Sequence, residues 1–158
     1  ELESLLTAYP ALAPESGGIG EIEKAAALEA WLKAQGISDI KHYDAPDPRV
    51  PSKLRPNLVA TIPGKRAEGP LWIMSHLDVV PEGELSLWDS DPWKVVVKDS
   101  KLYGRGVEGP QFSYLFSCFI VSGVYKIRGL SAAFGDKVIG KEDVDIRFSW
   151  ILSEFVRE

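Results

Sequence analysis

The stretch "PLWIMSHLDVVP", residues 70–81, is the most hydrophobic strand candidate in the chain. A short apolar run between prolines is typical of a buried β-strand, and this one loses its apolar character at Ser75 and His76. Because side chains alternate along an extended backbone, His76 and Asp78 are predicted to project to the same side. The end of this strand is therefore the first candidate for a functional site.

Helix-like and strand-like segments alternate along the rest of the chain. Apolar residues recur at helical spacing over residues 20–36, and Gly36 is placed to end that helix. The other predicted elements are strands over 38–45 and 57–64, a hairpin within 94–106 that turns at Asp99 and Ser100, a buried helix over 111–127 and a strand or helix over 144–156, with loops over 46–56, 82–93 and 128–143. Strands interleaved with helices favour an α/β layer architecture.

The composition is that of one globular domain, with 158 residues of which 45% are hydrophobic and 26% charged. The net charge of −5 argues against a protein that grips nucleic acid or an anionic membrane. The most apolar run, residues 113–125, is too short to span a bilayer. A single cysteine, Cys118, cannot form an internal disulfide, and no signal peptide is visible after Glu1. We therefore expect a cytoplasmic protein without nucleic-acid or membrane partners.

The pair His76 and Asp78 has two interpretations. An imidazole that binds a metal usually donates its second N–H to an oxygen acceptor, and an aspartate nearby is one way to supply that acceptor. The alternative is a hydrogen-bonded histidine with a structural role. A Ser-His-Asp triad is disfavoured, because Ser75 and His76 point to opposite sides of a strand.

Residues 104–109 spell G-x-G-x-x-G, the pattern of a dinucleotide-binding loop in which Arg105 could contact phosphate. Such a loop needs a buried parallel strand before it and a helix after it. Here the preceding strand is short, polar and the second arm of a predicted hairpin, and Pro110 follows directly. The alternative, favoured by this context, is a glycine-rich bend after a hairpin.

The acidic end of the sequence offers a third candidate. Glu154, within "SEFVRE" at residues 153–158, has the chemistry of a general base. The alternative is a solvated carboxylate, which the spacing alone favours.

Five segments in one order link these features: "PESGGIGEIEKAAALEAWLKAQG" (14–36), "RPNLVATIPG" (55–64), "LWIMSHLDVVPEG" (71–83), "LWDSDPW" (87–93) and "KDSKLYGRGVE" (98–108). In them the chain resembles the zinc-dependent amidohydrolases and metallopeptidases that include acetylornithine deacetylase, succinyl-diaminopimelate desuccinylase, aminoacylase, carboxypeptidase G and related dipeptidases. Residues 1–108 resemble the family well and residues 109–158 diverge from it. The resemblance implies a three-layer α/β/α fold with a mixed central sheet. It makes residues 1–158 a single, partial catalytic domain without the lid or dimerisation domain.

The resemblance also implies roles for particular residues. His76 matches a zinc ligand, Asp78 the acidic residue that orients it, and Glu154 the general base. The aspartate that bridges the two zinc ions of the family is replaced by Gly109, and the family's later ligands lie beyond the last residue. At most weak zinc binding is therefore expected. The family has a cis peptide bond after the bridging aspartate, which predicts a cis bond at Pro110.

These inferences predict a truncated, degenerate metal-dependent hydrolase of amide bonds in N-acyl amino acids or small peptides, inactive on its own because of Gly109 and the missing ligands. One alternative is a non-catalytic binding or regulatory module on the same fold, which self-associates through an exposed apolar surface. The remote alternative is dinucleotide binding through Gly104, Gly106 and Gly109.

Overall fold

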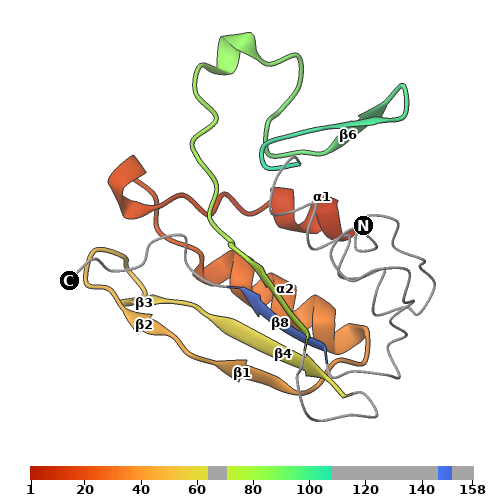
Figure 1. Cartoon of the computed structure of the whole chain (residues 1–158). Coiled ribbons are helices and arrows are strands. Elements are labelled where there is room, and N and C mark those ends of the chain that lie inside the picture. Colours follow the sequence, from red (N-terminus) through yellow and green to blue (C-terminus); the bar gives the residue numbers. More distant parts are fainter. Residues whose placement is uncertain (64–70, 108–145, 151–158) are drawn as a thin grey trace.

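The computed structural model describes residues 1–63, 71–107 and 146–150, and within them a four-stranded sheet forms the centre (Figure 1). Its strands are β1 (Ile40–His42), β4 (Leu58–Ile62), β5 (Leu71–Ser75) and β8 (Ile146–Trp150), in the spatial order β1-β4-β8-β5. β4 is antiparallel to both β1 and β8, whereas β5 and β8 are parallel. The sheet is therefore mixed, as the resemblance implied.

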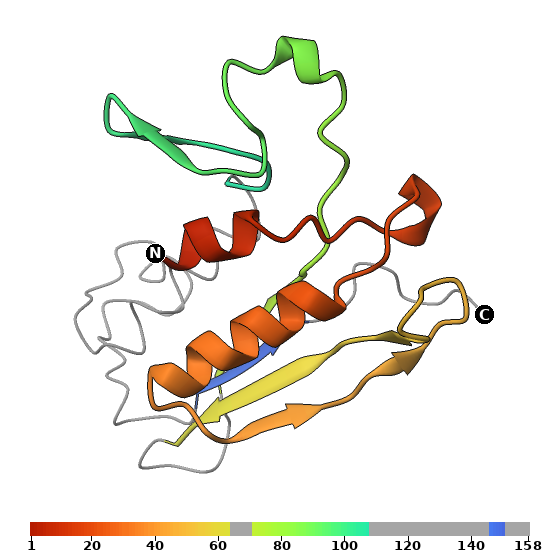
Figure 2. The ribbon, with the colours of Figure 1, turned by 180° about the vertical axis from the view of Figure 1, so that it is seen from behind.

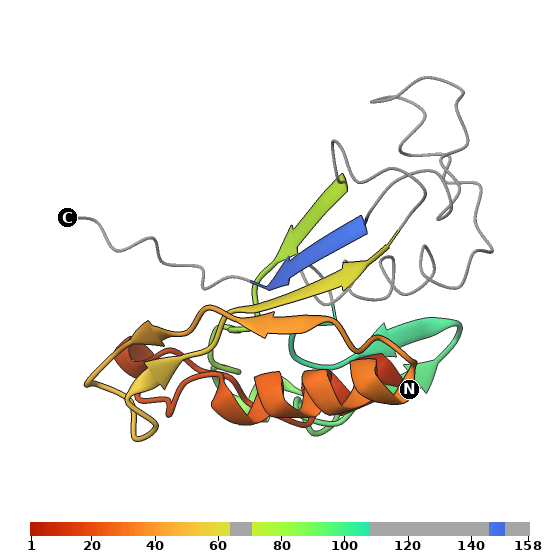
Figure 3. The same ribbon diagram turned by 90° about the horizontal axis from the view of Figure 1, so that it is seen from below.

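Two helices, α1 (Leu2–Thr7) and α2 (Ile22–Ala34), cover one face of this sheet (Figures 2 and 3). The helix predicted over 20–36 is confirmed, and its end is set by Gly36, whose φ of 84° is the left-handed conformation that glycine adopts without strain. The next residue, Ile37, donates its backbone N–H to the Leu32 carbonyl oxygen over 3.0 Å. This closes the helix in the manner of a Schellman motif.

The core lies between the helices and the sheet. Alternate residues of β4 are buried beneath α2, as expected for a strand with one face on a core. The buried hydrophobic residues of this cluster are Leu2, Leu6, Ala25, Leu28, Leu32, Ile37, Leu58, Ala60 and Leu77. Helix α1 was not predicted, because six residues carry too little periodicity. Leu2 and Leu6, at i and i+4, are held by packing in this core rather than by helix propensity.

Short elements occupy the segments predicted as loops. The proline-rich stretch 46–56 is not a plain loop, because β2 (Ala45–Pro46) and β3 (Leu54–Arg55) pair antiparallel at its two ends. The predicted strand over 38–45 is accordingly divided between β1 and β2. Single turns of 3₁₀ helix lie at Pro14–Ser16 and Leu85–Leu87.

The predicted hairpin is confirmed as β6 (Val96–Lys98) paired with β7 (Lys101–Tyr103). Its turn residues Asp99 and Ser100 both have positive φ, 51° and 58°, as the two-residue turns that suit a twisted hairpin require. Figure 1 shows the hairpin and the segment before it standing away from the sheet.

The sequence predicted either a strand or a helix over 144–156. Residues 146–150 form strand β8, so the strand alternative is correct for them. The helix predicted over 111–127 lies outside the described residues. The third layer of the expected α/β/α arrangement is therefore not among the elements described.

Candidate functional site

The candidate site begins where β5 ends, at Ser75. Beyond the strand the chain stays anchored, because the Val79 backbone N–H donates to the Ala11 carbonyl oxygen over 2.9 Å. Leu77 is buried in the core, 3% exposed, while its neighbours His76 and Asp78 lie on the other side of the chain. The alternation of sides expected of a strand thus continues over residues 76–78, beyond Ser75, the last residue of β5 that pairs with β8.

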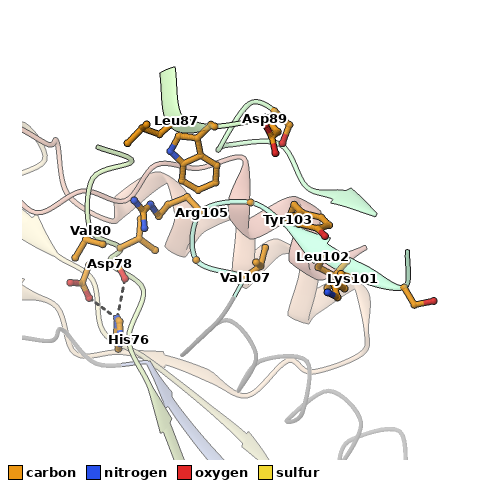
Figure 4. A pocket seen from close by; sticks show the side chains of 16 residues that line it. His76, Asp78, Val80, Leu87, Asp89, Lys101, Leu102, Tyr103, Arg105 and Val107 are labelled. Atoms are coloured by element: carbon orange, nitrogen blue, oxygen red, sulfur yellow. Dashed lines mark hydrogen bonds and ion pairs between the residues drawn. The ribbon is translucent and has the colours of Figure 1, made fainter. Parts of the chain in front are cut away.

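His76 and Asp78 are in direct contact (Figure 4). The imidazole Nδ1 lies 2.9 Å from the Asp78 carboxylate oxygen Oδ1 and 3.0 Å from the Asp78 carbonyl oxygen. The hydrogen bond is the one with the carbonyl oxygen, which can only accept, so the proton belongs on Nδ1 and the acceptor lone pair on Nε2. This arrangement is the one in which a histidine presents Nε2 to a metal ion.

The pair lines one end of a cavity of about 1060 Å³. Figure 4 shows His76 and Asp78 at one end and the β7 residues Lys101, Leu102 and Tyr103 at the other. Between them the walls come from the segment after Asp78 and from the glycine-rich turn. The cavity therefore joins the strand-end motif and the glycine motif in one place.

The glycine-rich turn follows an exposed hairpin arm, β7, and not a buried parallel strand. Gly106 has a φ of 82°. The Arg105 guanidinium donates to the Pro81 carbonyl oxygen over 2.6 Å and lies 5.3 Å from the centre of the Trp88 ring. The local context that a dinucleotide loop needs before its first glycine is thus missing, and the bend after a hairpin, which the sequence favoured, is what residues 103–107 form.

Two charged side chains of the helices, Lys24 and Glu3, are buried near Asp78. Lys24 on α2 is 1% exposed, and burial lowers its pKa to about 8 against the opposing effect of the Asp78, Glu3 and Glu21 carboxylates. Burial likewise raises the pKa of Glu3 to about 7, and the positive charge of Lys24 partly offsets that rise. Asp78 is thus near a buried cation as well as near His76.

Lys24 was not predicted, although its spacing carried a signal. It precedes the buried Leu28 and Leu32 by four and eight residues, which places it on the core face of α2. A lysine at such a position needs compensating carboxylates, because a buried unpaired ammonium is very unfavourable.

The remaining predicted site residues lie outside the described part of the chain. These are Glu154, Gly109 and the predicted cis bond at Pro110. Within residues 1–63, 71–107 and 146–150, no group of three or more His, Cys, Asp or Glu side chains could hold a metal ion. The described residues therefore do not complete a metal site by themselves.

Comparison with solved structures defines the class of the fold. A dipeptidase from Saccharomyces cerevisiae superposes with a TM-score of 0.65 at 20% identity, covering 96% of this chain and 31% of the dipeptidase. An M20 family metallo-carboxypeptidase from Sulfolobus solfataricus gives a TM-score of 0.63 at 19% identity, over 94% of this chain and 29% of that one. The chain thus has the α/β fold of part of a peptidase domain of this type.

Sequence comparison finds related proteins. Residues 72–119 match peptidase family M20/M25/M40. An uncharacterised metallohydrolase of Methanocaldococcus jannaschii is 36% identical over 130 residues, which are 80% of this chain and 32% of that protein. The acetylornithine deacetylase of Dictyostelium discoideum is 35% identical over 114 residues, which are 67% of this chain and 24% of the enzyme.

These matches confirm the resemblance drawn from the motifs: the chain is similar to proteins of peptidase family M20/M25/M40. It spans about a third of the length of the first of these relatives and about a quarter of the second. No helix among the described residues is long and apolar enough to cross a membrane.

Proposed function

We propose that the chain supplies part of a zinc-dependent hydrolase that cleaves amide bonds in N-acyl amino acids or small peptides. The observation that carries the proposal is the contact between His76 Nδ1 and Asp78, which directs Nε2 away from the carboxylate and toward a ligand. The names of the relatives, a metallohydrolase and a deacetylase, support the reaction class.

The residues of this chain have distinct tasks in that proposal. His76 would hold zinc through the Nε2 lone pair, and Asp78 fixes the proton on Nδ1 and so orients the imidazole. Glu154 acts as the general base that accepts a proton from the attacking water. When bound, zinc supplies the acidification of that water.

Position 109 limits what the chain can do alone. A carboxylate between two zinc ions neutralises part of their repulsion, and Gly109 offers no side-chain ligand. Zinc sites in hydrolases use about three protein ligands and one open position. We therefore expect weak zinc binding and no turnover by this chain on its own.

Zinc affinity measured without chelator tests the proposal directly. Gly109→Asp is expected to tighten zinc binding by about tenfold or more, and His76→Ala is expected to abolish that gain. His42→Ala is the matched control, because His42 is the other histidine of the chain, pairs with Glu29 on α2 and does not line the cavity. Equal zinc affinity in the His76→Ala and His42→Ala variants of Gly109→Asp would rule His76 out as the ligand.

The remaining features of the proposal follow from composition. The absence of an internal disulfide partner for Cys118 and the net charge of −5 support a cytoplasmic protein that binds neither nucleic acid nor membranes. The alternative of a non-catalytic module that self-associates stays a prediction. Its candidate surfaces, 112–125 and the side chains of 150–152, lie outside the part that the structure describes.

A further inference from the structure

Arg105 carries a positive charge that no carboxylate balances among the described residues. By contrast, Arg49 and Arg55 each pair with a carboxylate. The Arg105 guanidinium donates from Nη2 to the Pro81 carbonyl oxygen over 2.6 Å and lies 5.3 Å from the centre of the Trp88 ring. These contacts orient the group without neutralising it, and its Nε is buried with no hydrogen-bond partner in the part of the chain that the structure describes. A half-buried cation in this state is suited to an anion that a ligand supplies.

The cavity that Arg105 lines, about 1060 Å³, has the size of a small-molecule site. Its other charged residues are Asp78, Asp89 and Lys101. Asp78 is in contact with His76, whereas Asp89 and Lys101 are exposed, so solvent screens their charges. Arg105 is therefore the cation of this cavity that is best placed to bind a carboxylate.

Exposed apolar side chains gather in the same cavity. Val80 and Leu87 are 67% and 79% exposed, and Leu102 and Tyr103 are exposed as well. Figure 4 shows these four side chains around the space that Arg105 also lines. Large apolar side chains that cluster in a cavity, rather than lie singly on the surface, are typical of a site that a ligand covers.

We propose that this cavity binds a small molecule with both a carboxylate and a large apolar group, the carboxylate on Arg105 and the apolar group against Leu87. This rests on the proposed function in taking that molecule to be the substrate, which is then an N-acyl derivative of an amino acid with a large apolar side chain. A planar guanidinium that the Pro81 carbonyl and the Trp88 ring already hold loses little rotamer freedom when it binds a carboxylate.

The test is the binding of three probes to the full, metal-free chain, followed by ¹H–¹⁵N NMR. N-acetyl-L-phenylalanine carries both groups, N-acetyl-L-phenylalanine amide lacks the carboxylate, and N-acetylglycine lacks the apolar group. We expect N-acetyl-L-phenylalanine to bind about tenfold more tightly than either of the other two. Equal affinities for the three probes, or no binding at millimolar concentration, would overturn the proposal.

A variant at Arg105 tests the carboxylate contact. Arg105→Gln keeps a donor for the Pro81 carbonyl but has no charge. It should lower the affinity for N-acetyl-L-phenylalanine to that for the amide, and leave the affinity for the amide unchanged. Lys101→Gln is the matched control, because Lys101 is the other cation of the cavity, and it should change neither affinity. An equal loss with both probes in Arg105→Gln would mean that Arg105 acts on the structure alone, and the carboxylate contact would be wrong.

A variant at Leu87 tests the apolar contact. Leu87→Ser should weaken the binding of N-acetyl-L-phenylalanine about fivefold and leave that of N-acetylglycine unchanged. Leu85→Ser is the matched control, because Leu85 lies in the same turn of 3₁₀ helix, is 62% exposed and does not line the cavity. Equal effects of the two variants on the affinity for N-acetyl-L-phenylalanine would contradict the apolar contact.

Two further outcomes separate this proposal from its alternatives. If sedimentation shows that the chain self-associates and that Leu87→Ser abolishes the association, a second copy covers this surface and the proposal is wrong. If His76→Ala leaves the zinc affinity of the Gly109→Asp variant unchanged, the proposed function fails. The probe titrations need no metal, so they decide the ligand site whatever the zinc measurement gives.

Discussion

Gly18 shows how a single missing side chain shapes the site. A Cβ built at this position would overlap the carbonyl oxygen and the side chain of Leu12. Leu12 in turn forms a parallel bridge with Val79, directly after the His76–Asp78 pair. The close approach of Gly18 to Leu12 thus supports the segment on which the pair lies.

Gly18→Ala is expected to lower the free energy of unfolding by about 1–3 kcal/mol, because the backbone of Leu12 has to move. Urea denaturation followed by tryptophan fluorescence measures this. Gly36→Ala is the control, since nothing lies within 4 Å of its added Cβ and only the left-handed φ of 84° opposes the change. Its expected cost is about 1 kcal/mol. A smaller loss for Gly18→Ala than for Gly36→Ala would contradict the role given to the close approach.

At the scale of elements, a buried ion pair joins the start of α2 to the β2–β3 ladder. Arg55 donates from Nε and Nη2 to the two carboxylate oxygens of Glu21, each over 2.6 Å. Both residues are almost fully buried, 4% and 1% exposed. The second guanidinium amine, Nη1, donates to Asp47 over 3.3 Å. The proline-rich stretch is therefore ordered by charge as well as by its short strands.

Arg55→Met is expected to cost about 3–5 kcal/mol, because it leaves Glu21 buried without its bidentate partner. Adding Glu21→Gln to it should recover a large part of that loss, since the uncompensated charge is then gone. Lys33→Met removes one of the two partners of Glu29, in a partly exposed i,i+4 pair, and should cost only about 0.5 kcal/mol. Equal losses for Arg55→Met and Lys33→Met, measured by urea denaturation, would show that burial adds nothing to the Glu21–Arg55 pair.

Sequence patterns predicted those elements whose signal is local. The apolar periodicity of α2, the alternation in β4 and the Asp99–Ser100 turn each depend on neighbouring residues alone. Helix α1 and the β2–β3 pair could not be predicted, because residues distant in sequence stabilise them. Leu6 of α1 is buried in the core, and Arg55 of β3 pairs with Ala45 of β2. The same holds in the site. The His76–Asp78 contact is local and was foreseen, whereas the contacts of Arg105 with Pro81 and Trp88 join segments far apart in sequence.

Across the whole molecule, the buried carboxyl of Glu3 makes stability depend on pH. Burial raises its pKa from 4.5 to about 7 in the folded chain, and its side chain is 3% exposed. Between these two values the folded state binds more protons than the unfolded state. The contribution of Glu3 to stability is therefore complete below pH 4.5 and declines as the pH rises toward 7.

Glu3→Gln removes this decline, because an amide does not ionise. The variant should gain stability relative to the parent as the pH rises from 4.5 to 7, by at most about 3 kcal/mol. Thermal or urea unfolding at several pH values in this window measures the difference. Glu23→Gln, on the exposed side of α2, is the control, and its stability should depend on pH in the same way as that of the parent. A constant difference between Glu3→Gln and the parent across the window would mean that Glu3 does not titrate there.

The position of β8 in the sheet has a consequence for how the chain is made. Strand β8 lies between β4 and β5 and pairs with both, yet its residues 146–150 follow those of β5 by about seventy positions in the order of synthesis. Until a ribosome has released them, β4 and β5 each lack the neighbour that they have in the finished sheet. A nascent chain ending before residue 146 therefore presents two open strand edges, which chaperones or a second nascent chain can engage.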